Sequence, residues 1–293
     1  MTMGTLITAV TDGQNQQVKR FAEDAVDRAI AEGLLDKDGI QKLIENGDEF
    51  QADITASIER HSLRNQFADE EVESSYKYLS GYSKPKDITE QTNILRQFIP
   101  GIGFANEKIA EQPVPANAEG WFAIPRWQLV AKTYNEAVQK VLDLIKQQRK
   151  GNFYNYREGR IGEQYLRQLE RMSKKLEALG EAQKGYDILV VAAQFGLRHK
   201  GRSVRRTREV FMGNEFGLGA FEIGCMILTH PERLANYDDL WIDCVGNEYA
   251  SDGDGDFSDA PFFYFDDGRV RFGVGWIGDA GGYCSSASSF LPQ

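Results

Sequence analysis

The pattern of apolar residues changes at Tyr186, and this change limits the fold more than any other feature of the chain. Before it, apolar residues recur every three or four positions, as they do on one face of a helix. After it come a continuous apolar run at 188–193 and two segments, 262–265 and 269–274, that are typical of strands. The sequence therefore predicts an α+β fold.

Two long helices are predicted in the middle of the chain. Apolar residues keep helical spacing over 127–145 and again over 165–179, and the glycine-bounded segment 151–159 lies between them. We expect these helices to fold back as an antiparallel hairpin and to pack on a small mixed β-sheet. Asp266-Asp267-Gly268 is a typical turn sequence, which predicts a C-terminal β-hairpin.

The N-terminal part is predicted to be a separate helical region. Its apolar stripes, such as the one over 18–34, are narrow, and a narrow stripe covers only a small core or packs on a partner. Residues 112–120 contain two prolines and a closing glycine, which indicates a connector. We therefore expect a helical region at 1–111, interpreted as a module for a protein partner or for self-association, and an α+β domain at 121–293.

Composition narrows the class of protein. The 34 basic and 44 acidic residues among 293 give a net charge of -10, which argues against nucleic acid or anionic lipid binding over the whole surface. No apolar run is long enough for a membrane span. Cys225, Cys244 and Cys284 are far apart and form no CxxC pair, so we interpret them as reduced thiols in a cytoplasmic protein.

The segment 198–208 is strongly basic although the chain is acidic. It follows the predicted buried strand, contains Gly201 and precedes a short helix for which Ser203 is the expected N-cap. A strand, a glycine-bearing loop and a helix N-terminus can direct backbone N–H groups at a phosphate. We predict an anion site formed by Arg198, Lys200, Arg202, Ser203, Arg205, Arg206 and Arg208. The alternative is that these cations pair with the acidic segment 238–279.

An acidic loop within that segment resembles part of a calcium-binding loop. Asp252, Asp254 and Asp256 alternate with glycines, as positions 1, 3 and 5 of an EF-hand do. Phe257 and Phe263 occupy the positions where an EF-hand has glycine and glutamate, so the match is incomplete. The loop is interpreted either as a looser Ca²⁺ or Mg²⁺ site or as a solvated acidic turn.

No complete set of catalytic residues is visible in the chain. There is no Walker motif, no GxGxxG, no GxSxG elbow and no HExxH. We therefore expect an intracellular binding or structural protein whose basic segment takes nucleic acid or a phosphate-containing ligand. Two other hypotheses are a divalent-metal-dependent enzyme acting on a phosphate-containing substrate and a scaffold protein that assembles through its N-terminal helices.

Overall fold

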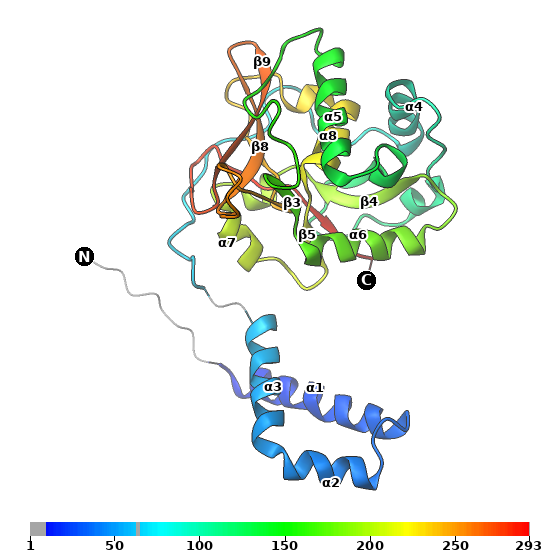
Figure 1. The fold of residues 1–293 in the computed structure, drawn as a ribbon, viewed down its shortest axis with the longest axis vertical. Helices are drawn as coiled ribbons and strands as arrows, with labels where there is room; N and C mark the ends of the chain where they lie inside the picture. The colour runs from blue at the N-terminus through cyan, green and yellow to red at the C-terminus, as the bar shows by residue number, and fades with distance from the viewer. Residues whose placement is uncertain (1–9, 63–64, 293) are drawn as a thin grey trace, which may run out of the picture. The chain divides into compact units, whose positions relative to one another are not determined.

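The computed structural model describes residues 10–62 and 65–292 and divides the chain into two units, Met1–Arg64 and Asn65–Gln293 (Figure 1). The boundary thus lies near residue 64, and not at the predicted connector 112–120. The reason is that Leu95 and Ile102 are buried in the same core as Phe122, so the segment before the connector belongs to the second unit. Their short apolar stripe resembled those of the first helices in sequence alone.

The first unit contains three helices within its described residues. They are α1 (Asp12–Ala31), α2 (Lys37–Glu45) and α3 (Gly47–His61). The predicted amphipathic helix over 18–34 corresponds to α1, which begins at a capping box formed by Thr11 and Gln14. Asp36 caps α2, accepting a hydrogen bond from the Gly39 amide. Side-chain caps thus begin α1 and α2, whereas the N-cap residue of α3, Asn46, makes no such hydrogen bond.

The second unit combines helices with two sheets, which confirms the α+β class. Its α-helices are α4 (Ile88–Phe98), α5 (Tyr134–Gln148), α6 (Glu170–Ala182), α7 (Val204–Glu209) and α8 (Ala220–Thr229). Its short 3-10 helices are η1 (Glu107–Glu111), η2 (Trp127–Leu129), η3 (Leu197–His199) and η4 (Pro231–Arg233). Its strands are β1 (Gly120–Pro125), β2 (Phe153–Asn155), β3 (Leu166–Gln168), β4 (Ile188–Gln194), β5 (Glu215–Gly217), β6 (Ile242–Asp243), β7 (Asn247–Tyr249), β8 (Asp259–Asp266), β9 (Arg269–Trp276) and β10 (Ser288–Phe290).

One sheet is built around the predicted apolar strand. Its order is β1-β4-β10-β5, and every pairing in it is antiparallel. All seven residues of β4 are buried, as the continuous apolar run predicted. Strand β10 lies between β4 and β5, and its Phe290 is part of the core.

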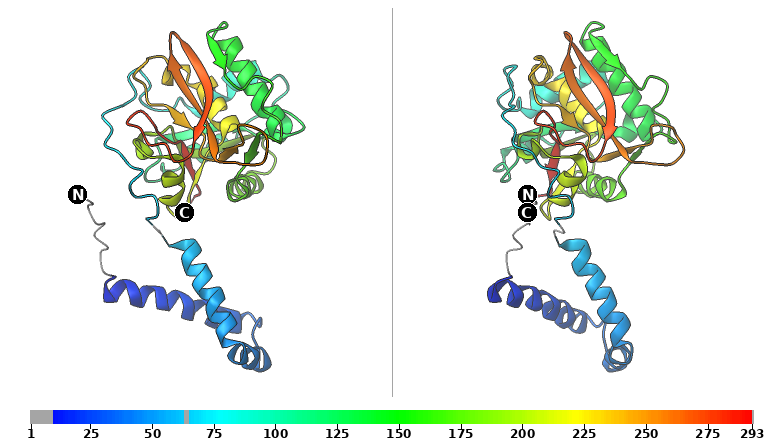
Figure 2. Two further views of the ribbon diagram at one scale, coloured as in Figure 1. Left: turned by 60° about the vertical axis from the view of Figure 1, so that its left-hand side comes forward. Right: turned by 90° about the vertical axis from the view of Figure 1, so that its left-hand side faces the viewer.

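The other sheet contains the predicted C-terminal hairpin. Its order is β2-β9-β8-β7-β3, with β6 also paired to β8. The twisted β8–β9 ribbon, orange in Figure 2, turns at Asp267 and Gly268, both of which have positive φ. Phe263 and Phe272 face each other across it and are fully buried, so one face of this hairpin belongs to the core.

Helix α8 lies at the centre of the second unit. All ten of its residues are buried, and α4, α5 and β1 pack against it. The predicted hairpin of long helices differs from what is observed: α5 begins at Tyr134 after the Thr133 cap, α6 begins at Glu170, and the residues between them supply β2 and β3. Helix α5 packs on α8, whereas α6 packs on β4 and β5, because each helix can cover more of its apolar face there.

Two further expectations from the sequence concern the cysteines and a membrane span. The three cysteines are free and buried. None of the helices in the described ranges has the length and apolar character needed to cross a bilayer.

Candidate functional site

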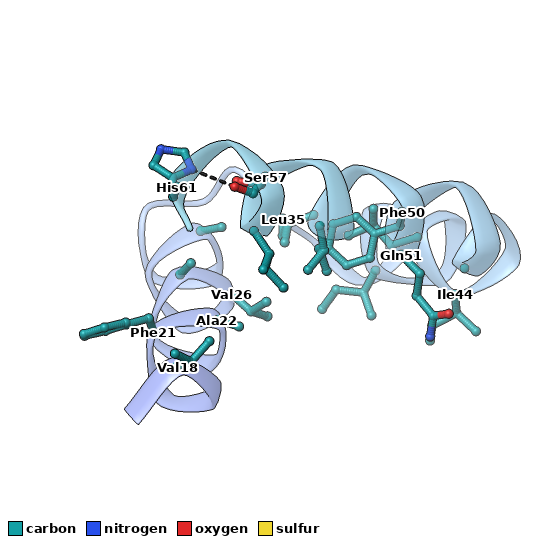
Figure 3. A pocket seen from close by; sticks show the side chains of 17 residues that line it. Val18, Phe21, Ala22, Val26, Leu35, Ile44, Phe50, Gln51, Ser57 and His61 are labelled. Atoms are coloured by element: carbon teal, nitrogen blue, oxygen red, sulfur yellow. Dashed lines mark hydrogen bonds between the residues drawn. The ribbon is translucent and has the colours of Figure 1, made fainter. Parts of the chain in front are cut away.

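An apolar groove of about 860 Å³ lies in the N-terminal unit (Figure 3). All three helices contribute to it. Helix α1 supplies a row of three alanines, Ala22, Ala25 and Ala29, and α3 supplies Phe50, Ile54 and Ile58. Polar side chains are few along its length and include Gln51 and His61. The groove is therefore an almost continuous apolar channel between helices.

The side chains around this groove are exposed. No side chain described in residues 10–62 is buried, and Phe21 and Ile44 are 61% and 68% exposed. Figure 3 shows Phe21 projecting away from α2 and α3. Most helical stability in proteins comes from packing of an apolar face, and exposed apolar patches of this kind mark interaction sites. The side chains described in residues 10–62 thus form no buried core that would hold the helices together.

The basic segment folds as the sequence predicted but faces the protein's own carboxylates. Ser203 caps α7 and accepts a hydrogen bond from the Arg206 amide. Lys200 donates to the Ser74 carbonyl oxygen, and Arg208 donates to the carbonyl oxygens of Val245 and Asn247. The cap is confirmed, while these two cations are occupied by main-chain oxygens.

Two glutamates from a distant segment hold most of the remaining arginines. Glu70 accepts from Ser203 and, through both carboxylate oxygens, from Arg205, while Glu71 lies 2.7 Å from Arg202. The Arg205 guanidinium also lies between two aromatic rings, those of Phe67 and Trp276. Arg206 reaches Glu71 and Glu209, at 3.3 Å and 2.9 Å.

These contacts keep both carboxylates ionised. Burial opposes ionisation of Glu70, but hydrogen bonds from Arg205 and Ser203 outweigh it and hold its pKa below the usual range. The hydrogen bond from Arg202 similarly lowers the pKa of Glu71. Glu70 and Glu71 were not among the predicted partners of the arginines, and the signal in the sequence that could have indicated them is the acidic run at 69–71.

Arg198 and the neighbouring His199 contact a buried carboxylate, Glu215. His199 Nε2 lies 2.7 Å from Glu215 Oε1, and Arg198 Nε lies 3.1 Å from the same oxygen. Burial lowers the pKa of His199, and Arg202 can only donate to its Nδ1, so the neutral ring carries its proton on Nε2 and donates it to Glu215. Although burial acts against it, hydrogen bonding from His199, Ser288 and Arg198 lowers the pKa of Glu215 to about 2.

The basic segment therefore lies in a network of ion pairs. The alternative of internal pairing describes these contacts better than an open anion site does, but the partners differ from those expected. Most of the carboxylate partners are Glu70, Glu71, Glu209 and Glu215, and among the described carboxylates of 238–279 the one that pairs with this segment is Glu248, 3.9 Å from Arg208. The network joins three stretches of chain within the second unit.

The three aspartates of the acidic loop do not form a metal cage. Asp252, Asp254 and Asp256 are exposed, and Asp254 accepts a hydrogen bond from the Asp256 amide. Across residues 10–62 and 65–292, no three His, Cys, Asp or Glu side chains are placed to hold a metal ion. The geometry is that of a solvated acidic turn before β8.

We expect the melting temperature of the protein in Ca²⁺ or Mg²⁺ to equal its melting temperature in NaCl of the same ionic strength. An ion that binds only the folded state would raise the melting temperature in a saturable way, by linkage. Thermal unfolding with increasing divalent ion checks this, with the Asp252→Asn and Asp254→Asn double variant as the control. A rise in the parent protein that the double variant lacks would contradict it and restore the metal site.

The cysteines offer no activated nucleophile. Burial raises the pKa of the Cys225 and Cys244 thiols well above the usual range, and Cys284 shifts in the same direction. A thiol in such surroundings keeps its proton at neutral pH, whereas a nucleophilic cysteine needs the thiolate. The three residues act as small core side chains.

Comparison of the chain with models of protein families, with curated proteins and with solved structures found no match.

Proposed function

We propose that this protein is an assembly protein that self-associates through its N-terminal unit, with a second copy of the chain covering the apolar groove. The observation that carries the proposal is the absence of any buried side chain among those described in residues 10–62, beside a groove of about 860 Å³. Helices whose described side chains form no core gain stability when another surface removes their apolar side chains from water.

The shape of the unit favours a second copy as the occupant. The three alanines of α1, Ala22, Ala25 and Ala29, leave a shallow surface that a neighbouring helix can approach closely. Val18 and Phe21 of the same helix are exposed, and Figure 3 shows Phe21 projecting from it. One surface thus carries both projections and a hollow, which is what a two-fold symmetric contact requires.

The charges along α1 leave the alanine row free for a second copy. Successive residues of a helix turn by about 100° around its axis, so Arg20, Asp24 and Asp27 lie on the side away from Ala22 and Ala25. These charged side chains stay in water when the alanine row is covered.

Dilution of the full chain tests this proposal, because folding of the unit and association are coupled. All four tryptophans lie in the second unit, so their fluorescence reports on that unit alone. Between about 100 µM and about 0.1 µM we expect a dimer to dissociate, with loss of helical circular dichroism and unchanged tryptophan fluorescence. Sedimentation velocity over the same range gives the mass.

The other outcomes would overturn self-association. A monomer that keeps its full helical signal at every concentration would show that the groove needs no cover. A monomer whose N-terminal helices are already lost at high concentration would show that the unit folds on a different partner. A dimer that persists when residues 1–64 are removed would place the contact in the second unit.

The other hypotheses have less support from the structure. Binding of nucleic acid or a phosphate-containing ligand at 198–208 requires arginines that are free of partners, and those described here contact Glu70, Glu71 and Glu215. The metal-dependent enzyme requires a cage that Asp252 and its neighbours do not form. Both stay predictions from sequence, and we place assembly first.

A further inference from the structure

A small pocket of about 140 Å³ lies in the second unit, beside the central helix α8. Glu222 of α8 lines it and is 2% exposed. The other walls come from η2, β3 and α6 and include the Trp127 indole, the Gln168 amide and Ser173. A carboxyl group inside the most buried helix of the molecule is costly unless something compensates for its lost hydration.

The hydrogen bonds of Glu222 satisfy one oxygen much better than the other. Its Oε2 accepts from the Tyr134 hydroxyl at 3.0 Å and from the Gly219 amide at 3.1 Å, which completes the N-terminal cap of α8. Its Oε1 accepts from one described side chain, Gln168, whose Nε2 lies 3.4 Å away. Both Glu222 and Gln168 line the pocket, so a stronger donor placed there would find an accepting oxygen.

The other residues of the pocket favour a donor that carries a positive charge. Glu177 and Glu181 of α6 also line it, and both are exposed, as is Gln128, so they mark the side that opens to solvent. Arg126 is the one cation among the lining residues, and its guanidinium donates to carbonyl oxygens at the C-terminal end of α6. An anion entering here would meet carboxylates, whereas a cation would meet complementary charge.

The apolar lining limits the rest of the ligand. Ile124, Leu176 and Leu189 supply aliphatic surface, and the indole of Trp127 supplies an aromatic face that attracts cations. A cavity of about 150 Å³ accommodates a molecule of about the size of benzene. We propose that this pocket binds a small primary alkylammonium ion, with the ammonium beside Glu222 and the alkyl chain against Ile124, Leu176 and Leu189.

The ionisation of Glu222 makes the binding dependent on pH. Burial raises the pKa of Glu222 to about 7, although hydrogen bonds from its own amide, Tyr134 and Gly219 act against burial. Tyr134 on α5 keeps its proton, because burial raises its pKa well above the usual range. Across the pocket, Gln168 is uncharged, and the charged groups are Glu177 and Glu181 on α6 and Arg126 after β1. Glu222 is therefore the group that changes charge near neutrality.

Titration of the full chain with butylammonium chloride tests the proposal. Calorimetry at about pH 8.5 should show saturable binding at one site per chain, and butanol, which lacks the charge, should bind far more weakly. At about pH 5.5 only about 3% of Glu222 is ionised if its pKa is 7, so the apparent affinity should fall about 30-fold. The amine itself stays protonated at both pH values.

Two variants separate the pocket from general charge effects. Glu222→Gln can keep the α8 cap, since glutamine also serves in capping boxes, and should abolish binding together with its pH dependence. Ser173→Leu leaves the charge unchanged but fills the cavity, and should also abolish binding. Glu158→Gln, at an exposed glutamate outside the pocket, is the matched control and should bind as the parent does.

Several results would overturn the proposal. They are no saturable heat with butylammonium at the higher pH, equal binding of butanol, or binding that survives both Glu222→Gln and Ser173→Leu. Thermal unfolding of each variant, followed by tryptophan fluorescence, establishes that the second unit is folded. If Glu222→Gln does not fold, the Ser173→Leu result decides, because Ser173 is partly exposed on α6.

Discussion

Replacing Ala25 with glutamate is expected to convert the assembled protein into a monomer. Ala25 is exposed in the single chain, so a glutamate there costs the isolated unit little. In the two-fold pair it would be buried in both copies without a partner, and a buried unpaired charge costs about 3–5 kcal/mol. Dimerisation should weaken at least about 100-fold, and the helical signal of the N-terminal unit should fall with it.

Ala52→Glu is the matched control for this experiment. Ala52 is also exposed, lies in α3 and does not line the groove. The same substitution should therefore leave the sedimentation profile and the helical signal close to those of the parent. Equal weakening by both substitutions would mean that added negative charge, and not the groove, controls assembly. No weakening by Ala25→Glu would show that the alanine row is outside the interface.

Replacing Glu215 with glutamine is expected to destabilise the second unit by about 3 kcal/mol or more. The substitution leaves Arg198 and the buried His199 without the carboxylate that both contact. Urea unfolding followed by tryptophan fluorescence measures the free energy of unfolding of this unit. Glu163→Gln, at an exposed glutamate, is the control and should change it by less than about 0.5 kcal/mol. An unchanged free energy in Glu215→Gln would show that the network contributes nothing to stability.

The same network should make stability fall in acid. Glu215 has a folded pKa of about 2, below its ordinary value near 4.5, so the unfolded state binds the proton more readily. Its contribution is complete above about pH 4.5 and is lost as the pH falls towards 2. His199 acts in the same direction below about pH 6.5, because burial lowers its pKa as well. Glu215→Gln should remove the part of the slope that lies below pH 4.5.

Local signals in the sequence were sufficient for several elements. Ser203 was predicted as an N-cap, and it accepts the amide hydrogen bond from Arg206 that begins α7. The turn Asp266-Asp267-Gly268 and the apolar run of β4 also lie where they were expected. These predictions agree with the structure because a cap, a turn or a buried strand depends on residues that are close together in the chain.

Elements that depend on distant partners were predicted less well. Over 165–179 the apolar spacing suits a helix, yet Leu166–Gln168 forms β3, because β7 offers those residues a strand to pair with. The prediction of a helical hairpin is wrong for the same reason, because α5 packs on α8 whereas α6 packs on β4 and β5. Tertiary pairing overrides local periodicity when it satisfies the backbone and buries more apolar surface.

The same distinction between local sequence and distant contacts applies to the candidate sites. Sequence alone determined that the N-terminal helices carry narrow apolar stripes and that 198–208 is a basic turn before a helix, because both depend on spacing along one segment. Only the tertiary structure decided that the arginines meet Glu70 and Glu71, some 130 residues earlier, and that Glu222 faces a pocket within the core. The charge state and the burial of a site residue depend on contacts with residues from distant parts of the chain. The spacing of residues within one segment contains no information about those contacts.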